Sequence, residues 1–115
     1  MAIYYIPFGI QTYIPVTTED IKPRSFYKLC IRNQKTIKAI EAVMSAKADG
    51  VMVKKMVRAK VVMPTSGKVF FVDSTGGVIA ENDGEFRINA EDLENILMSY
   101  IKENNIQRGE GDVLH

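Results

Sequence analysis

The spacing of apolar side chains predicts two amphipathic helices. Apolar positions recur three or four residues apart over residues 34–48 and again after Asn89, which is the repeat of a helix with one buried face. Asn33 and Asn89 stand where each helix would begin, and Asp92 has capping-box spacing from the second cap. The two apolar stripes are Ile37, Ile40, Met44 and Ala48 in the first helix, and Leu93, Ile96, Leu97, Tyr100 and Ile101 in the second.

Most other apolar segments are rich in β-branched and aromatic residues and are bounded by turn-forming residues, which favours strands. The expected strands are residues 2–6, 10–16, 25–32, 51–63, 68–73, 78–81 and 85–88. Residues 25–32 and 51–63 also admit a helical interpretation. Thr17 and Asp20 have capping-box spacing for one helical turn, which Pro23 would stop.

These elements predict an α+β domain. We expect an antiparallel sheet of five to seven strands with two helices packed on one face, in the order β-β-β-α-β-β-β-β-α. At 115 residues the chain fits one domain, which we place at residues 1–104. Residues 105–115 are mostly polar and are expected to form a flexible tail.

Two glycine-containing segments look like parts of nucleotide-binding loops. They are residues 66–68 (Ser-Gly-Lys) and residues 75–77 (Thr-Gly-Gly). A phosphate-binding loop needs a helix after it and, in the P-loop, a hydroxyl side chain after the lysine. Here Val69 follows the lysine, and both segments lead into predicted strands. They are therefore predicted to be hairpin turns.

The residues that usually carry chemistry are scarce. The single cysteine, Cys30, excludes an internal disulfide and a multi-cysteine metal cluster, and its apolar neighbours predict a buried thiol. The one histidine, His115, is the last residue. Asp73 and Asp83 flank predicted turns, where aspartate commonly bonds to the local backbone. We therefore predict no catalytic residue, no metal and no cofactor, and an enzyme is the least favoured class.

Composition favours an ordinary globular protein. Hydrophobic residues make up 46% of the chain and charged residues 25%, which are typical globular values. No stretch approaches the roughly 20 apolar residues that a membrane span needs. The N-terminus lacks the basic start and apolar run of a signal peptide. A cytoplasmic location without membrane contact is expected.

The charges are divided unevenly along the chain. Residues 1–80 carry 12 Lys and Arg against 5 Asp and Glu, whereas residues 81–115 carry 3 against 9. Attraction between the two parts within the fold is one explanation. Separate basic and acidic binding surfaces are the other.

The favoured function is a non-catalytic protein-binding module. Its concrete form is a small immunity or inhibitor protein that neutralises a toxin or enzyme by covering the active site. The partner-binding residues would be acidic side chains at a hairpin tip and a helix start, which would face a basic partner. They are Asp83, Glu85, Glu91 and Glu94. Turn formation and helix capping also explain these acids without a partner, and a dimer formed at an N-terminal edge strand is left open.

The alternative function is nucleic-acid binding by a basic sheet face. On a strand over residues 51–63, Lys54, Arg58 and Lys60 would share one face. The nearby tyrosines that could stack on bases are Tyr4, Tyr5 and Tyr13. No known nucleic-acid-binding motif accompanies them, and a solvated sheet face explains the same pattern.

Overall fold

The computed structural model describes residues 1–81 and 84–109, and within them the chain forms one six-stranded sheet and three helices. The sheet order is β2-β1-β3-β4-β5-β6, and every neighbouring pair is antiparallel. The strands are β1 (Ala2–Tyr5), β2 (Tyr27–Cys30), β3 (Val57–Val62), β4 (Val69–Asp73), β5 (Gly77–Ala80) and β6 (Gly84–Arg87). The helices are α1 (Ile21–Arg24), α2 (Gln34–Ser45) and α3 (Ala90–Glu103). The predicted α+β class is confirmed.

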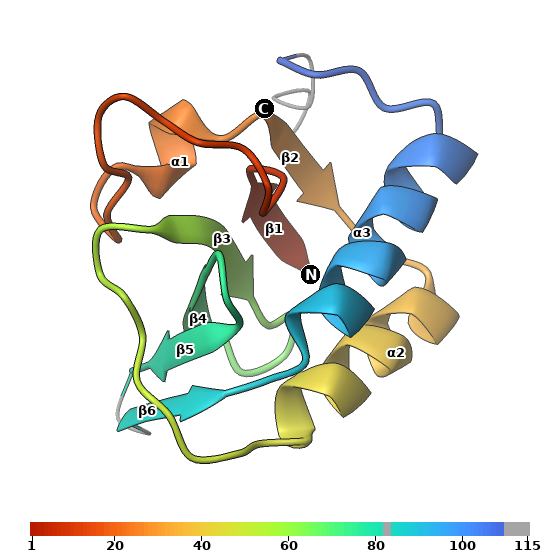
Figure 1. The fold of residues 1–115 in the computed structure, drawn as a ribbon. Helices are drawn as coiled ribbons and strands as arrows, with labels where there is room; N and C mark the ends of the chain where they lie inside the picture. Colours follow the sequence, from red (N-terminus) through yellow and green to blue (C-terminus); the bar gives the residue numbers. More distant parts are fainter. Residues whose placement is uncertain (82–83, 110–115) are drawn as a thin grey trace.

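The helices α2 and α3 lie side by side on one face of the sheet, as predicted (Figure 1). The side chain of Asn33 accepts a hydrogen bond from the N–H of Thr36, and that of Asn89 accepts one from the N–H of Asp92. Both predicted N-caps are therefore confirmed. Within the described residues, no helix is long and apolar enough to cross a membrane. The helix residues buried in the main core are Ile37, Ile40, Met44, Leu93, Leu97 and Ile101.

The opposite face of the sheet is covered over part of its area. Figure 1 shows α1 and the connection between α2 and β3 on the side away from α2 and α3. These segments supply a second apolar cluster, against which Phe71 and Ile79 of the sheet pack. The buried members of this cluster are Ile6, Val16, Ile21, Met52 and Val57. The sheet is thus enclosed by helices on one side and by irregular chain on the other.

The prediction of a strand over residues 10–16 is wrong. This segment is a loop that makes an isolated parallel bridge between Val16 and Met56. The guanidinium of Arg24 donates one hydrogen bond to the carbonyl oxygen of Ile14 and another to that of Pro15, and each is 2.8 Å long. Here a side chain takes the place of a strand partner.

The predicted helical turn is present, but Asp20 and not Thr17 is its N-cap, and among the described residues no side chain caps the first N–H groups of the turn. The carboxylate of Asp20 accepts hydrogen bonds from the backbone N–H of Thr17 at 2.6 Å and from its hydroxyl at 3.2 Å. Pro23 lies inside α1 instead of stopping it. The first turn of a helix has no use for a backbone N–H donor, so proline is tolerated there.

The strand expected over residues 51–63 is shorter than predicted. Pairing begins at Val57 and ends at Val62, and the preceding residues form a connection outside the sheet. The register between β3 and β4 shifts between Val57 and Ala59. Such a β-bulge places one extra residue, Arg58, opposite its partner strand and breaks the simple alternation of faces.

The two glycine segments that resembled nucleotide-binding loops are turns between antiparallel strands. Gly67 and Gly76 have φ angles of +70° and +95°, a backbone conformation that glycine adopts with little strain. The segments join β3 to β4 and β4 to β5. The predicted hairpins are confirmed.

The side chain of Asp73 forms hydrogen bonds within the β4–β5 turn and also to the connection that precedes β3. Its buried carboxylate accepts hydrogen bonds from the N–H groups of Thr75 at 2.7 Å and Gly77 at 2.9 Å. The second carboxylate oxygen accepts one from the N–H of Val53 at 2.7 Å. A side chain at Gly77 would collide with this carboxylate, because an added Cβ would lie 2.6 Å from it. The structural role predicted for Asp73 is confirmed.

Residues 105–109, expected to begin the polar tail, lie against the domain. The N–H of Gly109 donates to the carbonyl oxygen of Phe26 at 2.8 Å, and the guanidinium carbon of Arg108 lies 3.5 Å from the centre of the Phe26 ring. Ile106 packs against the main core. Residues 110–115 lie outside the described residues.

Replacing Asp73 with alanine is expected to lower the free energy of unfolding by about 3 kcal/mol or more. The substitution leaves the N–H groups of Val53 and Gly77 without an acceptor, and each unpaired buried donor costs about 1–3 kcal/mol. Chemical denaturation measures the loss. Asp49→Ala, at an exposed position, is the matched control and should change stability by less than about 0.5 kcal/mol. Equal stability of the two variants would contradict the role of Asp73.

Candidate functional site

Of the acidic residues predicted to bind a partner, the three that the structure describes are divided between β6 and α3. Glu85 lies on β6 and pairs across from Ile79, so it belongs to the face away from α2 and α3. Glu91 and Glu94 lie on α3. The N–H of Met52 donates to the carboxylate of Glu85 at 3.0 Å. The remaining predicted residue, Asp83, lies outside the described residues.

Glu94 is half-buried and serves the fold. Its carboxylate accepts hydrogen bonds from the hydroxyl of Tyr5 at 2.5 Å and from the N–H of Phe8 at 2.6 Å. Burial and then the bond to Glu94 raise the pKa of Tyr5, so the hydroxyl stays protonated and donates. These bonds join α3 to β1 and to the turn that follows β1, which leaves Glu94 a structural role.

The basic trio predicted for the sheet face is also separated. Arg58 is only 4% exposed, and its guanidinium donates to the carbonyl oxygens of Ile10 at 3.2 Å and Val57 at 3.0 Å. Burial first, and then the charge of Arg24, lower the pKa of Arg58. The placement of Arg58 on an exposed basic face is therefore wrong, because the loop that contains Ile10 covers its side chain.

The two lysines of the trio are accessible but lie apart along the chain. Lys54 is exposed in a turn before β3. Lys60 is half-buried within β3 and points to the face away from α2 and α3, since its neighbours Ala59 and Val61 are buried in the main core. Of the three, Lys60 is thus the one that stays accessible on the predicted sheet face.

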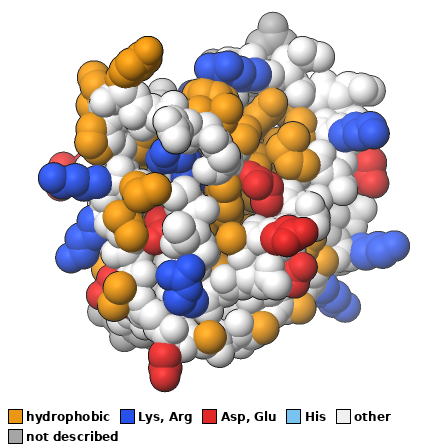
Figure 2. Space-filling view, in the orientation of Figure 1, with side chains coloured by type: hydrophobic (Ala, Val, Ile, Leu, Met, Phe, Trp, Pro, Cys, Tyr) orange, Lys and Arg blue, Asp and Glu red, His pale blue; other side chains and the backbone are white. Residues whose placement is uncertain are grey.

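Exposed apolar side chains gather instead on two adjoining loops. Among the described residues, six of the seven exposed large hydrophobic side chains come from residues 10–14 and 51–56. The bridge between Val16 and Met56 joins the two loops. Figure 2 shows hydrophobic side chains over both loops at the left edge, with basic side chains beside them. We call this the two-loop surface: Ile10, Tyr13, Ile14, Val51, Val53 and Met56.

The backbone beneath the two-loop surface is fastened at several points. Arg24 and Arg58 donate to carbonyl oxygens of the first loop, and Asp73 accepts from Val53 in the second. In contrast, the side chain of Tyr13 is fully exposed and that of Ile14 is 69% exposed. The loops therefore hold apolar side chains toward solvent on a backbone that hydrogen bonds fix at several points.

Sequence reasoning missed most of this surface. It named Tyr13, but as a base-stacking residue on a strand. A usable signal was present, because Pro7 and Pro15 enclose the segment and proline is rare within a paired strand. The exposure of Val51 and Val53 had no such signal, since alternating valines are what a strand would show.

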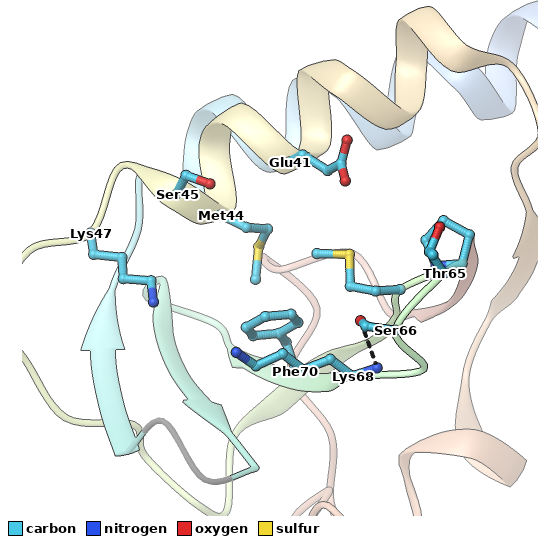
Figure 3. A pocket seen from close by; sticks show the side chains of 10 residues that line it. Glu41, Met44, Ser45, Lys47, Thr65, Ser66, Lys68 and Phe70 are labelled. Atoms are coloured by element: carbon cyan, nitrogen blue, oxygen red, sulfur yellow. Dashed lines mark hydrogen bonds between the residues drawn. The ribbon is translucent and has the colours of Figure 1, made fainter.

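A shallow pocket of about 420 Å³ lies between the end of α2 and the β3–β4 loop (Figure 3). Met44, Met63 and Phe70 supply its apolar part, and the carboxylate of Glu41 lies at its rim. The Lys47 ammonium lies 4.5 Å from the centre of the Phe86 ring. Among the described lining residues, the serine and threonine hydroxyls have no histidine beside them that could act as a base.

The side chains that commonly bind metals do not form a metal site within the described residues. There, no three His, Cys, Asp or Glu side chains are grouped so that they could hold a metal ion. Cys30 is exposed, which corrects the prediction of a buried thiol. It lies on the edge strand β2 and points away from the core, because its neighbours Leu29 and Ile31 are the buried ones.

Comparisons with known proteins gave no match to a family model, a curated protein or a solved structure. The function is therefore argued from the geometry, burial and charge of the chain's own residues. By these criteria the two-loop surface is the strongest candidate site, since it holds six of the seven large hydrophobic side chains that are exposed among the described residues, and exposed apolar side chains grouped on bridged loops are a mark of interaction sites.

Replacing Glu94 with alanine is expected to lower the free energy of unfolding by about 2 kcal/mol, since Tyr5 and Phe8 lose their acceptor. Glu91→Ala, at an exposed position in the first turn of the same helix, should cost about 1 kcal/mol or less through the helix dipole. Urea denaturation compares the two. A larger loss for Glu91→Ala would show that Glu94 is not a structural residue.

The free energy of unfolding is expected to fall as the pH rises above about 10, the ordinary pKa of tyrosine. The fold raises the pKa of Tyr5, so the unfolded chain releases this proton first and is favoured at alkaline pH. Below that pH the contribution of Tyr5 to stability is constant. Tyr5→Phe should flatten the alkaline slope of the free energy of unfolding against pH, whereas Tyr13→Phe, at a fully exposed position, should keep it. An unchanged slope in Tyr5→Phe would refute this account.

Proposed function

We propose that this protein is a non-catalytic protein-binding module whose partner docks on the two-loop surface. The observation that carries the proposal is the gathering of exposed Tyr13, Ile14, Val51, Val53 and Met56 on two bridged loops. Burying these side chains against a partner removes apolar surface from water, which is the main driving force of protein association. Tyrosine is also enriched at the energetic centres of interfaces.

The hydrogen bonds that hold the backbone of the loops support the same function. Ordering a flexible loop on binding costs free energy, and a loop already held in one conformation avoids that cost. Arg24 holds the carbonyl oxygens beside Ile14, and Arg58 holds that of Ile10. The first loop is therefore prepared to present its side chains without rearrangement.

The charges at the rim indicate the chemistry of the partner. Lys54 and Lys55 are exposed and stand between Val53 and Met56 in the second loop. A complementary partner would place an apolar contact against Ile14 and Val53, with acidic side chains opposite the lysines. In its concrete form, the proposed function is that of an immunity or inhibitor protein, and the active site that it covers on its partner would carry carboxylates. The sequence had suggested the opposite arrangement, in which acidic residues of this chain face a basic partner.

A photo-crosslinking amino acid at position 13 is expected to capture one partner protein in lysate of the source organism. The same amino acid at position 38, on the exposed outer side of α2, is the matched control and should not capture it. The captured protein is then purified, and its affinity for the unlabelled chain is measured by calorimetry. Ile14→Ser with Val53→Ser should weaken binding about 100-fold or more, as loss of central apolar contacts typically does.

Two results would overturn the proposal. One is equal capture from positions 13 and 38, which indicates nonspecific contact. The other is unchanged affinity of the purified partner for the Ile14→Ser, Val53→Ser variant. Because both side chains are exposed, the variant should keep the wild-type unfolding midpoint, so a loss of binding is not explained by unfolding.

A further inference from the structure

Part of the sheet face opposite α2 and α3 remains accessible and carries a row of aromatic and basic side chains. The strand registers align Lys28, Tyr4, Lys60 and Phe71 across β2, β1, β3 and β4. All four are half-buried. We call them the aromatic row. The half-buried apolar residues of the adjoining row are Ala2, Val62 and Val69.

Two ammonium groups stand over the rings of the aromatic row. The Lys60 ammonium is 5.9 Å from the centre of the Tyr4 ring and 5.8 Å from that of Phe71. The ammonium of Lys22, from α1, is 5.5 Å from the Tyr4 ring. These are cation–π distances. Lysine side chains are long and flexible, so each ammonium can turn from a ring to a bound anion while the backbone stays fixed.

Positive charge is concentrated at one end of this face. Lys22, Lys28 and Lys60 surround Tyr4 over β2, β1 and β3. The acid of the same cross-strand row, Glu85, lies at the other edge of the sheet on β6. A polyanion is therefore attracted to the end that carries Tyr4, and repelled from the β6 edge.

We propose that the aromatic row binds single-stranded nucleic acid. Unpaired bases stack on the rings of Tyr4 and Phe71, and the backbone phosphates pair with Lys22, Lys28 and Lys60. The two rings lie two strand spacings apart, about 10 Å, and flat aromatic platforms with adjacent cations are suited to unpaired bases. Bases inside a duplex cannot stack on such a surface. This site shares no residue with the two-loop surface and goes beyond the protein-binding function.

Fluorescence anisotropy with labelled single-stranded oligonucleotides of about twelve nucleotides tests the proposal. The expected result is binding that weakens steeply between about 50 and 200 mM salt, with a duplex of the same sequence bound more weakly. Lys60→Gln should reduce the slope of log affinity against log salt by about 0.7, the value for one phosphate contact on a single strand. Lys38→Gln, an equal charge change on the exposed side of α2, should leave the slope unchanged.

Tyr4→Leu separates stacking from simple attraction of charge. Leucine keeps an apolar side chain but has no aromatic face, so affinity for the single strand should fall roughly tenfold. Absence of binding at low salt, equal loss in Lys60→Gln and Lys38→Gln, or full affinity in Tyr4→Leu would each overturn the proposal. So would a polyglutamate peptide bound as tightly as the oligonucleotide. The Ile14→Ser, Val53→Ser variant should bind the oligonucleotide normally, which distinguishes this site from the protein-binding surface.

Discussion

The carboxylate of Asp73 is buried at the point where the sheet and its irregular cover meet. One oxygen accepts from Thr75 and Gly77, which shapes the β4–β5 turn, and the other accepts from Val53. A buried carboxylate is costly unless hydrogen bonds replace its lost water, and here the backbone supplies them. Because Val53 is held, Met52 is placed in the second apolar cluster, and the side chains of the second loop are directed outward. The candidate binding surface therefore depends on a turn in the sheet.

The two faces of the sheet are enclosed by different means, and this difference produces both candidate surfaces. On one face, α2 and α3 cover the sheet with regular apolar stripes. On the other, a loop, a single helical turn and a connection cover the part near Val57, Phe71 and Ile79. Irregular chain satisfies its backbone with side chains such as Arg24 and leaves apolar side chains exposed. Where this cover ends, Tyr4 and Lys60 face solvent.

The sequence was sufficient to predict the elements whose signals are local. The α2 and α3 stripes repeat with the helical period, Asn33 and Asn89 are strong caps, and the turns after β3 and β4 are marked by glycine. Residues 51–56 could not be predicted in this way, and for residues 10–16 the flanking prolines were the one local signal. The valines, isoleucines and tyrosine of both segments suit a strand, and contacts with residues elsewhere in the chain, such as Arg24, Arg58 and Asp73, hold them as loops. The candidate site was missed for the same reason, because it lies on these segments.

The different positions of the arginine and lysine side chains follow from the chemistry of these two residue types. Arg58 and Arg24 lie beneath the two-loop surface, where the planar guanidinium donates in several fixed directions to carbonyl oxygens. Lys54 and Lys60 remain accessible, and the ammonium of a lysine is strongly hydrated and tolerates burial poorly. A stripe of mixed Arg and Lys in a sequence is therefore not evidence for one basic surface. In this fold Arg24 and Arg58 shape the loops, and Lys54 and Lys60 are cations left for a partner.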